Sequence, residues 1–186
     1  SEKQLEALAG TTNLEEFIQT LKSTPYRDLV SDPTIAGEPH NLEKAFNCYD
    51  IKLHQKIMAS TKGKPRELVF MLLAKYDLQN FKSLLRLWFQ PSPREEEITY
   101  LIPEKICYPL PVKEILASRT LDEVLGYLGD TPYQSPLLVA RDRFQAKNTL
   151  FPLEVALDQN YYDRLQRKIQ GLRASDRKIA SRLIGI

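Results

Sequence analysis

The chain is 186 residues long, 42% of them hydrophobic and 27% charged, and its 26 basic and 24 acidic residues leave a formal net charge of +2. This composition is typical of a folded globular protein and excludes a disordered chain or a strongly basic nucleic-acid binder. No apolar run approaches the roughly 20 residues that span a bilayer, and the N-terminus carries no apolar signal-peptide core. We therefore expect a soluble, cytoplasmic protein.

The residues that most often carry chemistry are few and scattered. Cys48 and Cys107 follow no CxxC or zinc spacing, and the only histidines are His40 and His54. The seven glycines form no phosphate-binding loop ending in Gly-Lys-Ser/Thr. Cys48 and His54 would lie about 240° apart around one expected helix, so they do not form a catalytic pair. We expect no catalytic residue, no metal and no cofactor.

The N-terminal part of the chain reads as short helices and turns. Apolar residues recur every three or four positions over residues 2–23, across a Gly-Thr-Thr-Asn break in which Asn13 can cap the second piece. Tyr26 follows a Thr-Pro turn. Residues 31–41 hold two prolines and a glycine and are expected to be a loop, whereas residues 42–61 again show helical spacing.

The longest helical pattern in the chain covers residues 67–89. Apolar side chains cover most of its circumference, so we expect a central helix enclosed by other helices. Just before it, Gly63 fits the position after a helix end and Pro65 fits the first turn of the next helix. Only a narrow polar strip should face solvent: Lys75, Gln79, Lys82 and Arg86.

Two polar residues interrupt the apolar face of this helix. Asn80 lies in the middle of the face, where an unpaired amide would cost about 1–3 kcal/mol, so it is expected to be buried and hydrogen-bonded. Asp77, one turn earlier, needs an Arg, Lys or backbone amide as donor. We expect both residues to fix the packing of neighbouring helices, and Leu84 to lie in the core.

A change of composition follows the central helix. Residues 90–99 contain two prolines and three consecutive acids, which marks the boundary between two domains of 1–95 and 96–186. Residues 100–112 carry three prolines and are expected to be extended. Helical spacing returns over residues 113–127.

The two domains are related by an internal repeat. Residues 13–30 align with residues 120–137 without a gap, so that Glu16 matches Glu123 and the Thr-Pro-Tyr turn of Tyr26 matches that of Tyr133. Further matches follow after small shifts: Leu42, Glu43, Phe46 and Tyr49 correspond to Leu153, Glu154, Leu157 and Tyr161. We call the two copies the first and the second repeat, and expect them to share one fold.

The second repeat stops where the first enters its central helix. The residues that match Asp77 and Asn80 would come just after Ile186. Because a repeat without its main buried helix is a poor end for a domain, we expect the chain to be a fragment of a longer protein. Apolar side chains near its end should then be partly uncovered and dimerise or meet crystal neighbours, namely Leu172, Leu183 and Ile184.

These motifs together resemble the C subunit of the archaeal and bacterial A-type and V-type ATPases, which is related to the d subunit of the vacuolar ATPase. The resemblance covers most of the chain and rests on the order and spacing of the repeated motifs. Its central-helix motif reads Lys75-Tyr76-Asp77-Leu78-Gln79-Asn80-Phe81-Lys82-Ser83-Leu84-Leu85-Arg86. Two features depart from the family: Lys75 stands where Glu is usual, and the chain holds about one and three-quarters of three repeats.

The resemblance implies an all-α fold of repeated multi-helical domains, funnel-shaped in the full protein. It also implies a non-catalytic subunit on the cytoplasmic face of the membrane, linking the central stalk to the membrane rotor ring for proton or sodium transport or ATP synthesis. Stalk and ring subunits would be its partners, without nucleic acid and without transmembrane insertion. The motif residues expected to be structural or interacting are Tyr26, Glu43, Tyr49, Asp77, Asn80, Lys82, Arg86, Tyr133 and Glu154.

Residues 163–182 hold the one local excess of positive charge, seven basic against two acidic side chains. This pattern favours a solvated helix face or docking on an acidic partner surface. Nucleic acid is less favoured, because no aromatic residues interleave with the basic ones. For the whole chain, a helical-repeat adaptor with unrelated partners is the alternative to a rotary ATPase subunit.

Overall fold

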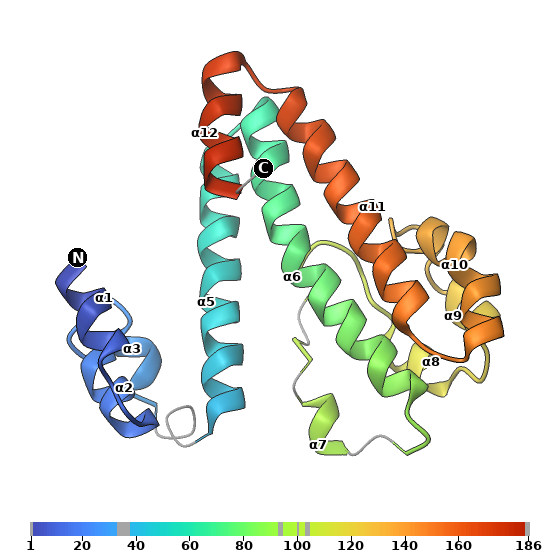
Figure 1. Cartoon of the computed structure of the whole chain (residues 1–186), viewed down its shortest axis with the longest axis horizontal. Helices are drawn as coiled ribbons and strands as arrows, with labels where there is room; N and C mark the ends of the chain where they lie inside the picture. Colours follow the sequence, from blue (N-terminus) through green and yellow to red (C-terminus); the bar gives the residue numbers. More distant parts are fainter. Residues whose placement is uncertain (1, 33–37, 93–94, 100, 103–104, 185–186) are drawn as a thin grey trace. The chain divides into compact units, whose positions relative to one another are not determined.

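The computed structural model describes residues 2–32, 38–92, 95–99, 101–102 and 105–184. All regular secondary structure in these residues is helical, which confirms the expected all-α fold (Figure 1). By contacts, the chain divides into two compact units, Ser1–Asp50 (unit 1) and Ile51–Ile186 (unit 2). The predicted division into 1–95 and 96–186 describes the sequence repeat and stays a prediction.

Unit 1 contains helices α1 (Glu2–Ala9), α2 (Leu14–Leu21) and α3 (Arg27–Val30) and the first part of α5 (Pro39–Ser60). Their apolar residues form one small core of Ile18, Leu21, Val30 and Leu42. Helix α5 begins within the stretch that was expected to be a loop, because proline is accepted in the first turn of a helix. Residues 33–37 of that stretch lie outside the described residues.

The core of unit 2 is built on α6 (Gly63–Phe89), the expected central helix. Gly63 has a φ of +63°, a left-handed conformation that favours glycine, and Pro65 follows in the first turn. Leu84 is fully buried, which confirms its place in the core. Of the expected polar strip, Lys75, Gln79 and Arg86 are exposed, but the prediction was wrong for Lys82, which is buried.

Short helices connect α6 to the second half of unit 2: α7 (Glu95–Ile98), α8 (Val112–Ala117) and α9 (Leu121–Gly126). The single helix expected over residues 113–127 is therefore two helices. The backbone is extended at Ser118, and the Thr120 side chain caps α9 by accepting from the Glu123 amide. The indole N–H of Trp88 donates to the Ser118 carbonyl at 2.9 Å, so the break in the helix also contacts α6.

Unit 2 ends with three helices, α10 (Gln134–Lys147), α11 (Phe151–Gln170) and α12 (Ala174–Ile184). Helix α11 runs beside α6 and contacts α10 as well (Figure 1). Its inward stripe is buried between them and consists of Leu153, Leu157, Tyr161, Leu165 and Ile169. A central helix of one repeat thus packs against helices of the next.

The C-terminal apolar residues are more covered than expected. Leu172 is buried, and Ile184 is partly buried and packs against the main core. The expectation of uncovered side chains is therefore wrong for Leu172, because α12 contacts α11 and also contributes the buried Ala180. The side chain of Leu183 lies outside the described residues.

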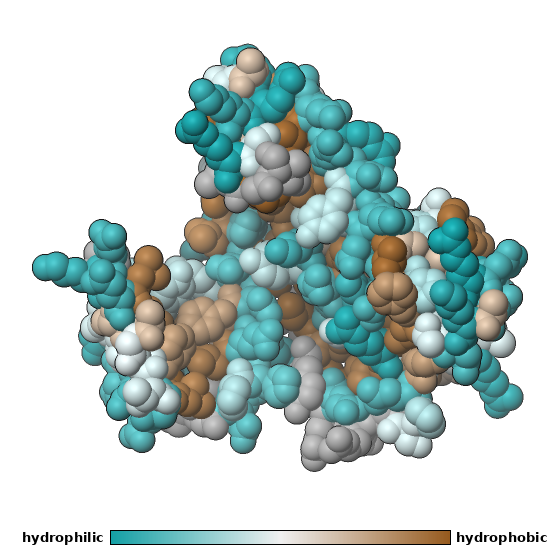
Figure 2. All heavy atoms as spheres, in the orientation of Figure 1, coloured by the Kyte–Doolittle hydropathy of each residue, from teal (hydrophilic) through white to brown (hydrophobic). Residues whose placement is uncertain are grey.

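On the face drawn in Figure 2, hydrophilic atoms cover much of the molecule, and hydrophobic atoms lie in patches between them. Among the described residues, no helix combines the length and the hydropathy needed to cross a membrane.

Candidate functional site

Asp77 is the centre of a buried polar cluster on α6. Only 1% of the residue is exposed. Its Oδ1 accepts hydrogen bonds from the backbone amides of Cys107, at 3.0 Å, and Tyr108, at 3.3 Å. Its Oδ2 accepts from the hydroxyl of Tyr133 at 2.5 Å. These donors offset the cost of burying a carboxylate, and the expected backbone amide donor is confirmed.

Asn80 lies one turn further along α6 and is 9% exposed. Its side chain accepts from the Ile102 amide at 2.8 Å and donates to the Ile102 carbonyl at 3.0 Å. Asn80 therefore bonds to both backbone polar groups of this residue. The prediction of a buried, hydrogen-bonded Asn80 is confirmed. With Asp77 it binds the backbone of the segment between α7 and α8, whereas packing of neighbouring helices was expected.

The surroundings of Asp77 raise the pKa values of two further groups. Burial, and then the negative charge of Asp77, raise the pKa of Tyr133 far above its usual value, and they raise the pKa of Cys107 to about 12. The Tyr133 ring also stacks on Phe81, with centroids 4.6 Å apart. A thiol and a phenol that stay protonated at neutral pH do not supply a nucleophile or a general base. The cluster instead holds the backbone of Cys107 and Tyr108 and the side chain of Tyr133 against α6, and we call it the Asp77 clamp.

Three ion pairs join α6 to α11, and the two formed by Lys82 and Arg86 involve predicted motif residues. Lys82 Nζ donates to both carboxylate oxygens of Asp158, at 2.8 and 3.0 Å. Arg86 donates to Glu154 from Nε at 2.7 Å and from Nη2 at 3.0 Å. The hydrogen bond from Arg86 lowers the pKa of Glu154, and the hydrogen bond to Glu154 raises the pKa of Arg86. Bidentate contacts of this kind fix the register of the two helices.

Sequence reasoning did not find Asp158. A signal was present, because Lys82 and Arg86 are four residues apart, as are Glu154 and Asp158. Residues with this spacing lie on one helix face, so the two pairs match when the helices pack side by side. Lys82 can be buried because it pairs with Asp158, whose side chain is 39% exposed.

The remaining predicted residues lie in unit 1. The ring of Tyr26 contacts Phe46 and Tyr49 edge to face, with centroids 5.5 Å apart in both pairs. Glu43 is exposed on α5, and 38% of Tyr49 is exposed. The structure therefore groups the other six predicted residues around α6 in unit 2, and these three in unit 1.

Hydrogen bonds at two helix starts follow the internal repeat. The side chain of Asn13 accepts from the Glu16 amide at 2.9 Å, and that of Thr120 accepts from the Glu123 amide at 3.3 Å. In both, the glutamate carboxylate accepts from the amide just before the cap, at 2.9 and 2.7 Å. Each start therefore resembles a capping box, except that the glutamate binds the amide one residue before the cap.

The turn after each of these helices is also the same. The Thr24 hydroxyl donates to a carbonyl three residues earlier at 2.6 Å and accepts from the Tyr26 amide at 3.2 Å. The Thr131 hydroxyl makes the same two bonds, at 2.8 Å and, from the Tyr133 amide, at 3.3 Å. Tyr26 and Tyr133 therefore lie at equivalent positions at the end of equivalent turns.

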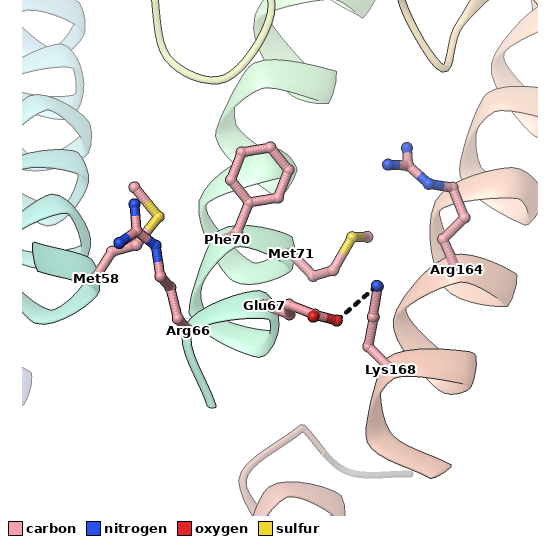
Figure 3. Close-up of a pocket in the computed structure, with 7 residues that line it drawn as sticks. All are labelled: Met58, Arg66, Glu67, Phe70, Met71, Arg164 and Lys168. Atoms are coloured by element: carbon pink, nitrogen blue, oxygen red, sulfur yellow. Dashed lines mark hydrogen bonds and ion pairs between the residues drawn. The ribbon is translucent and has the colours of Figure 1, made fainter. Parts of the chain in front are cut away.

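Unit 2 also has an open pocket of about 390 Å³ between α5, α6 and α11 (Figure 3). Its apolar lining consists of Met58, Phe70 and Met71, and its charged lining of Arg66, Glu67, Arg164 and Lys168. Lys168 pairs with Glu67 at 2.7 Å, and Arg164 donates to the Tyr108 hydroxyl at 2.9 Å. Part of the basic segment 163–182 is thus paired within the chain.

No group of three or more His, Cys, Asp or Glu side chains is placed to hold a metal ion in the part of the chain that the structure describes. The family model described as ATP synthase (C/AC39) subunit matches residues 1–186. The chain belongs to this family. The match therefore confirms the resemblance that the repeated motifs indicated.

Similar members of the ATP synthase (C/AC39) subunit family are named as the C subunit of the A-type ATP synthase. The protein of Methanocaldococcus jannaschii is 26% identical over 89% of this chain and 42% of its own length. That of Pyrococcus horikoshii is 24% identical over 99% of this chain and 48% of its own length. That of Methanosarcina acetivorans is 28% identical over 92% of this chain and 46% of its own length.

The chain thus spans less than half the length of these relatives. No solved structure matches it. In this chain, Asp77 and Asn80 fix α6 to Ile102, Cys107 and Tyr108, and three ion pairs fix it to α11.

Proposed function

We propose that the protein is a non-catalytic coupling subunit of a rotary ATPase, linking its central stalk to its membrane rotor ring. The observation that carries the proposal is the match of the family model over the whole chain. As part of that assembly it would lie peripherally on the cytoplasmic face of the membrane. It would serve ATP-driven proton or sodium transport, or ATP synthesis.

The internal structure of unit 2 supports a mechanical role. A part that transmits torque must resist sliding and rotation of its helices. Ion pairs set the register of α6 against α11, and the hydrogen bonds of the buried Asp77 and Asn80 hold Ile102, Cys107 and Tyr108 in place along α6. We propose that the predicted motif residues contribute through this stiffness.

The chemistry of the described residues supports a role without catalysis. Burial and the charge of Asp77 raise the pKa values of Cys107 and Tyr133, so neither group ionises readily. The pocket of Figure 3 offers apolar contact and positive charge, which suit binding. Its acidic member, Glu67, is already paired with Lys168.

Affinity capture tests the proposal. The native protein that contains this chain, tagged and isolated from its own membranes in mild detergent, should retain the stalk and ring subunits of the ATPase. A tagged helical protein of similar size and charge serves as control. Retention of neither stalk nor ring subunits would overturn the proposal, and retention of unrelated proteins instead would favour a general adaptor.

A further inference from the structure

The pocket between α5, α6 and α11 carries more positive charge than its own acidic residue neutralises (Figure 3). Glu67 is bound to Lys168, which leaves Arg66 and Arg164. The hydrogen bond of Arg164 within the chain goes to a hydroxyl, that of Tyr108, at 2.9 Å, and not to a carboxylate. Arg66 has no hydrogen-bond or ion-pair partner among the described residues. Two guanidinium groups, one from α6 and one from α11, are therefore available to an anion at this pocket.

The floor of the pocket is apolar and held in place. Met71 is 2% exposed, and Phe70 and Met58, which also line the pocket, are partly buried. The Phe70 ring contacts the ring of Tyr108 edge to face, with centroids 6.0 Å apart. The backbone amide of Tyr108 in turn donates to Asp77. An incoming apolar group thus meets a surface that is already ordered, which lowers the entropy cost of binding.

Positive charge continues beyond the pocket along α11 and α12. Arg164 and Lys168 belong to the segment 163–182, which holds seven basic and two acidic side chains. Its exposed members outside the pocket include Arg167 and Arg173. A local excess of one sign attracts a partner surface of the opposite sign and speeds their association. The pocket therefore adjoins a basic surface that favours an acidic partner.

We propose that this pocket docks an acidic segment of a partner protein. An aromatic or large aliphatic side chain of that segment enters against Phe70 and Met71, and carboxylates on either side of it pair with Arg66 and Arg164. Guanidinium groups bind carboxylates through two parallel hydrogen bonds, and methionine side chains adapt to the shape of the group they contact. Buried apolar anchors of this kind supply much of the binding energy at protein interfaces.

The openness of the pocket favours a protein segment over a small molecule. Arg66 and Lys168 are exposed, whereas small-molecule sites commonly enclose about 70–90% of their ligand. A polypeptide gains further contacts outside the pocket, where other basic side chains lie. A flat membrane surface would reach those exposed side chains but not Met71 at the floor. The inference goes beyond the proposed rotary role and does not rest on it, because the partner is defined by its chemistry alone.

The methionines of the chain make the pocket directly observable. Met58 and Met71 are the only two in the sequence and both line the pocket, so isotope labelling of methionine methyl groups should give two NMR signals. The probe is the peptide Glu-Glu-Phe-Glu-Glu, blocked at both ends. We expect both signals to shift saturably as this peptide is added to the whole chain.

Two further blocked peptides separate the charge from the anchor. Gln-Gln-Phe-Gln-Gln keeps the aromatic side chain without charge, and Glu-Glu-Ala-Glu-Glu keeps the charge without the aromatic side chain. Each should bind at least about tenfold more weakly than the first peptide, because each loses one of the two contributions to affinity.

Removing one guanidinium separates pairing in the pocket from general attraction to a basic chain. Arg66→Gln should weaken binding of the acidic peptide about three- to tenfold, because a charged pair is lost. Arg143→Gln removes the same charge from an exposed position on α10 that does not line the pocket, and should leave the affinity unchanged. Both arginines are exposed, so both variants should stay folded, which circular dichroism checks.

Three results would overturn the inference: no shift of the Met71 signal, equal weakening by Arg66→Gln and Arg143→Gln, or equal affinity for the charged and uncharged peptides. Equal shifts of both signals with inorganic phosphate, or with vesicles of anionic phospholipid, would assign the pocket to a free anion or to a membrane and also overturn it. None of these outcomes bears on the rotary role, because no stalk or ring subunit is present.

Discussion

At the scale of the residue, Asp77 shows how a buried charge can organise a fold. Its position on an apolar helix face was enough to predict that it must have hydrogen-bond donors. The donors themselves could not be predicted, because Cys107, Tyr108 and Tyr133 lie 30 to 56 residues away in sequence. Helical periodicity describes one element and carries no information on which distant backbone amide meets it.

Removing the Tyr133 hydroxyl should weaken this clamp. Tyr133→Phe keeps the ring on Phe81 but leaves the carboxylate of Asp77 with one donor fewer, so we expect the free energy of unfolding to fall by about 1–3 kcal/mol. Urea denaturation followed by circular dichroism measures the loss. Tyr127→Phe, at a tyrosine that is 50% exposed, is the matched control and should change stability little. Equal effects of the two substitutions would contradict the clamp.

At the scale of the element, α6 was the best predicted part of the chain. Its apolar pattern is long enough to fix its type and its central place, and Gly63 and Pro65 mark its start. By contrast, the prediction of a single helix over residues 113–127 was wrong, because the chain forms two helices there. Thr120 acts as a cap inside an otherwise helical pattern, and capping is decided by the backbone direction that the tertiary structure imposes.

Truncating a core residue of α6 should be costly. Leu84 is fully buried in the main core, so Leu84→Ala should lower the free energy of unfolding by about 2–5 kcal/mol through lost apolar burial and the cavity left behind. Thermal or urea unfolding measures it. Leu138→Ala on α10, where the leucine is 46% exposed, should cost far less. A cost below that of the Leu138 control would show that α6 is not the core helix.

The ion pair between Arg86 of α6 and Glu154 of α11 should make the free energy of unfolding depend on pH. Arg86 lowers the pKa of Glu154 below the value of 4.5 expected for the unfolded chain. A lowered folded-state pKa gives stability that is fully present above pH 4.5 and is lost as the pH falls through the folded-state pKa. Because half of the Arg86 side chain is exposed, the gain is only about 0.2–1 kcal/mol.

Glu154→Gln tests this pair. The difference in unfolding free energy between the unchanged chain and the variant should be largest near pH 7 and should shrink below pH 4.5. Glu6→Gln on α1 should show no such trend, since that side chain is exposed. A difference for Glu154→Gln that stays constant from pH 7 to pH 3 would speak against the ion pair.

At the scale of the whole molecule, the internal repeat explains most of what the sequence could predict. The matching Thr-Pro-Tyr turns are local, so the sequence alignment of residues 13–30 with 120–137 was enough to find them. The compact units 1–50 and 51–186 could not be found in this way. They arise because α6, a helix of the first repeat, packs on α8 and α11 of the second.

The coupling role is tested most directly by the ratio of ions transported to ATP hydrolysed in a reconstituted rotary ATPase. Without the native protein that contains this chain, the catalytic head should still hydrolyse ATP while ion transport is lost. Adding the protein back should restore transport, and the purified protein alone should hydrolyse no ATP. Undiminished transport without it, or ATP turnover by the purified protein, would contradict the account.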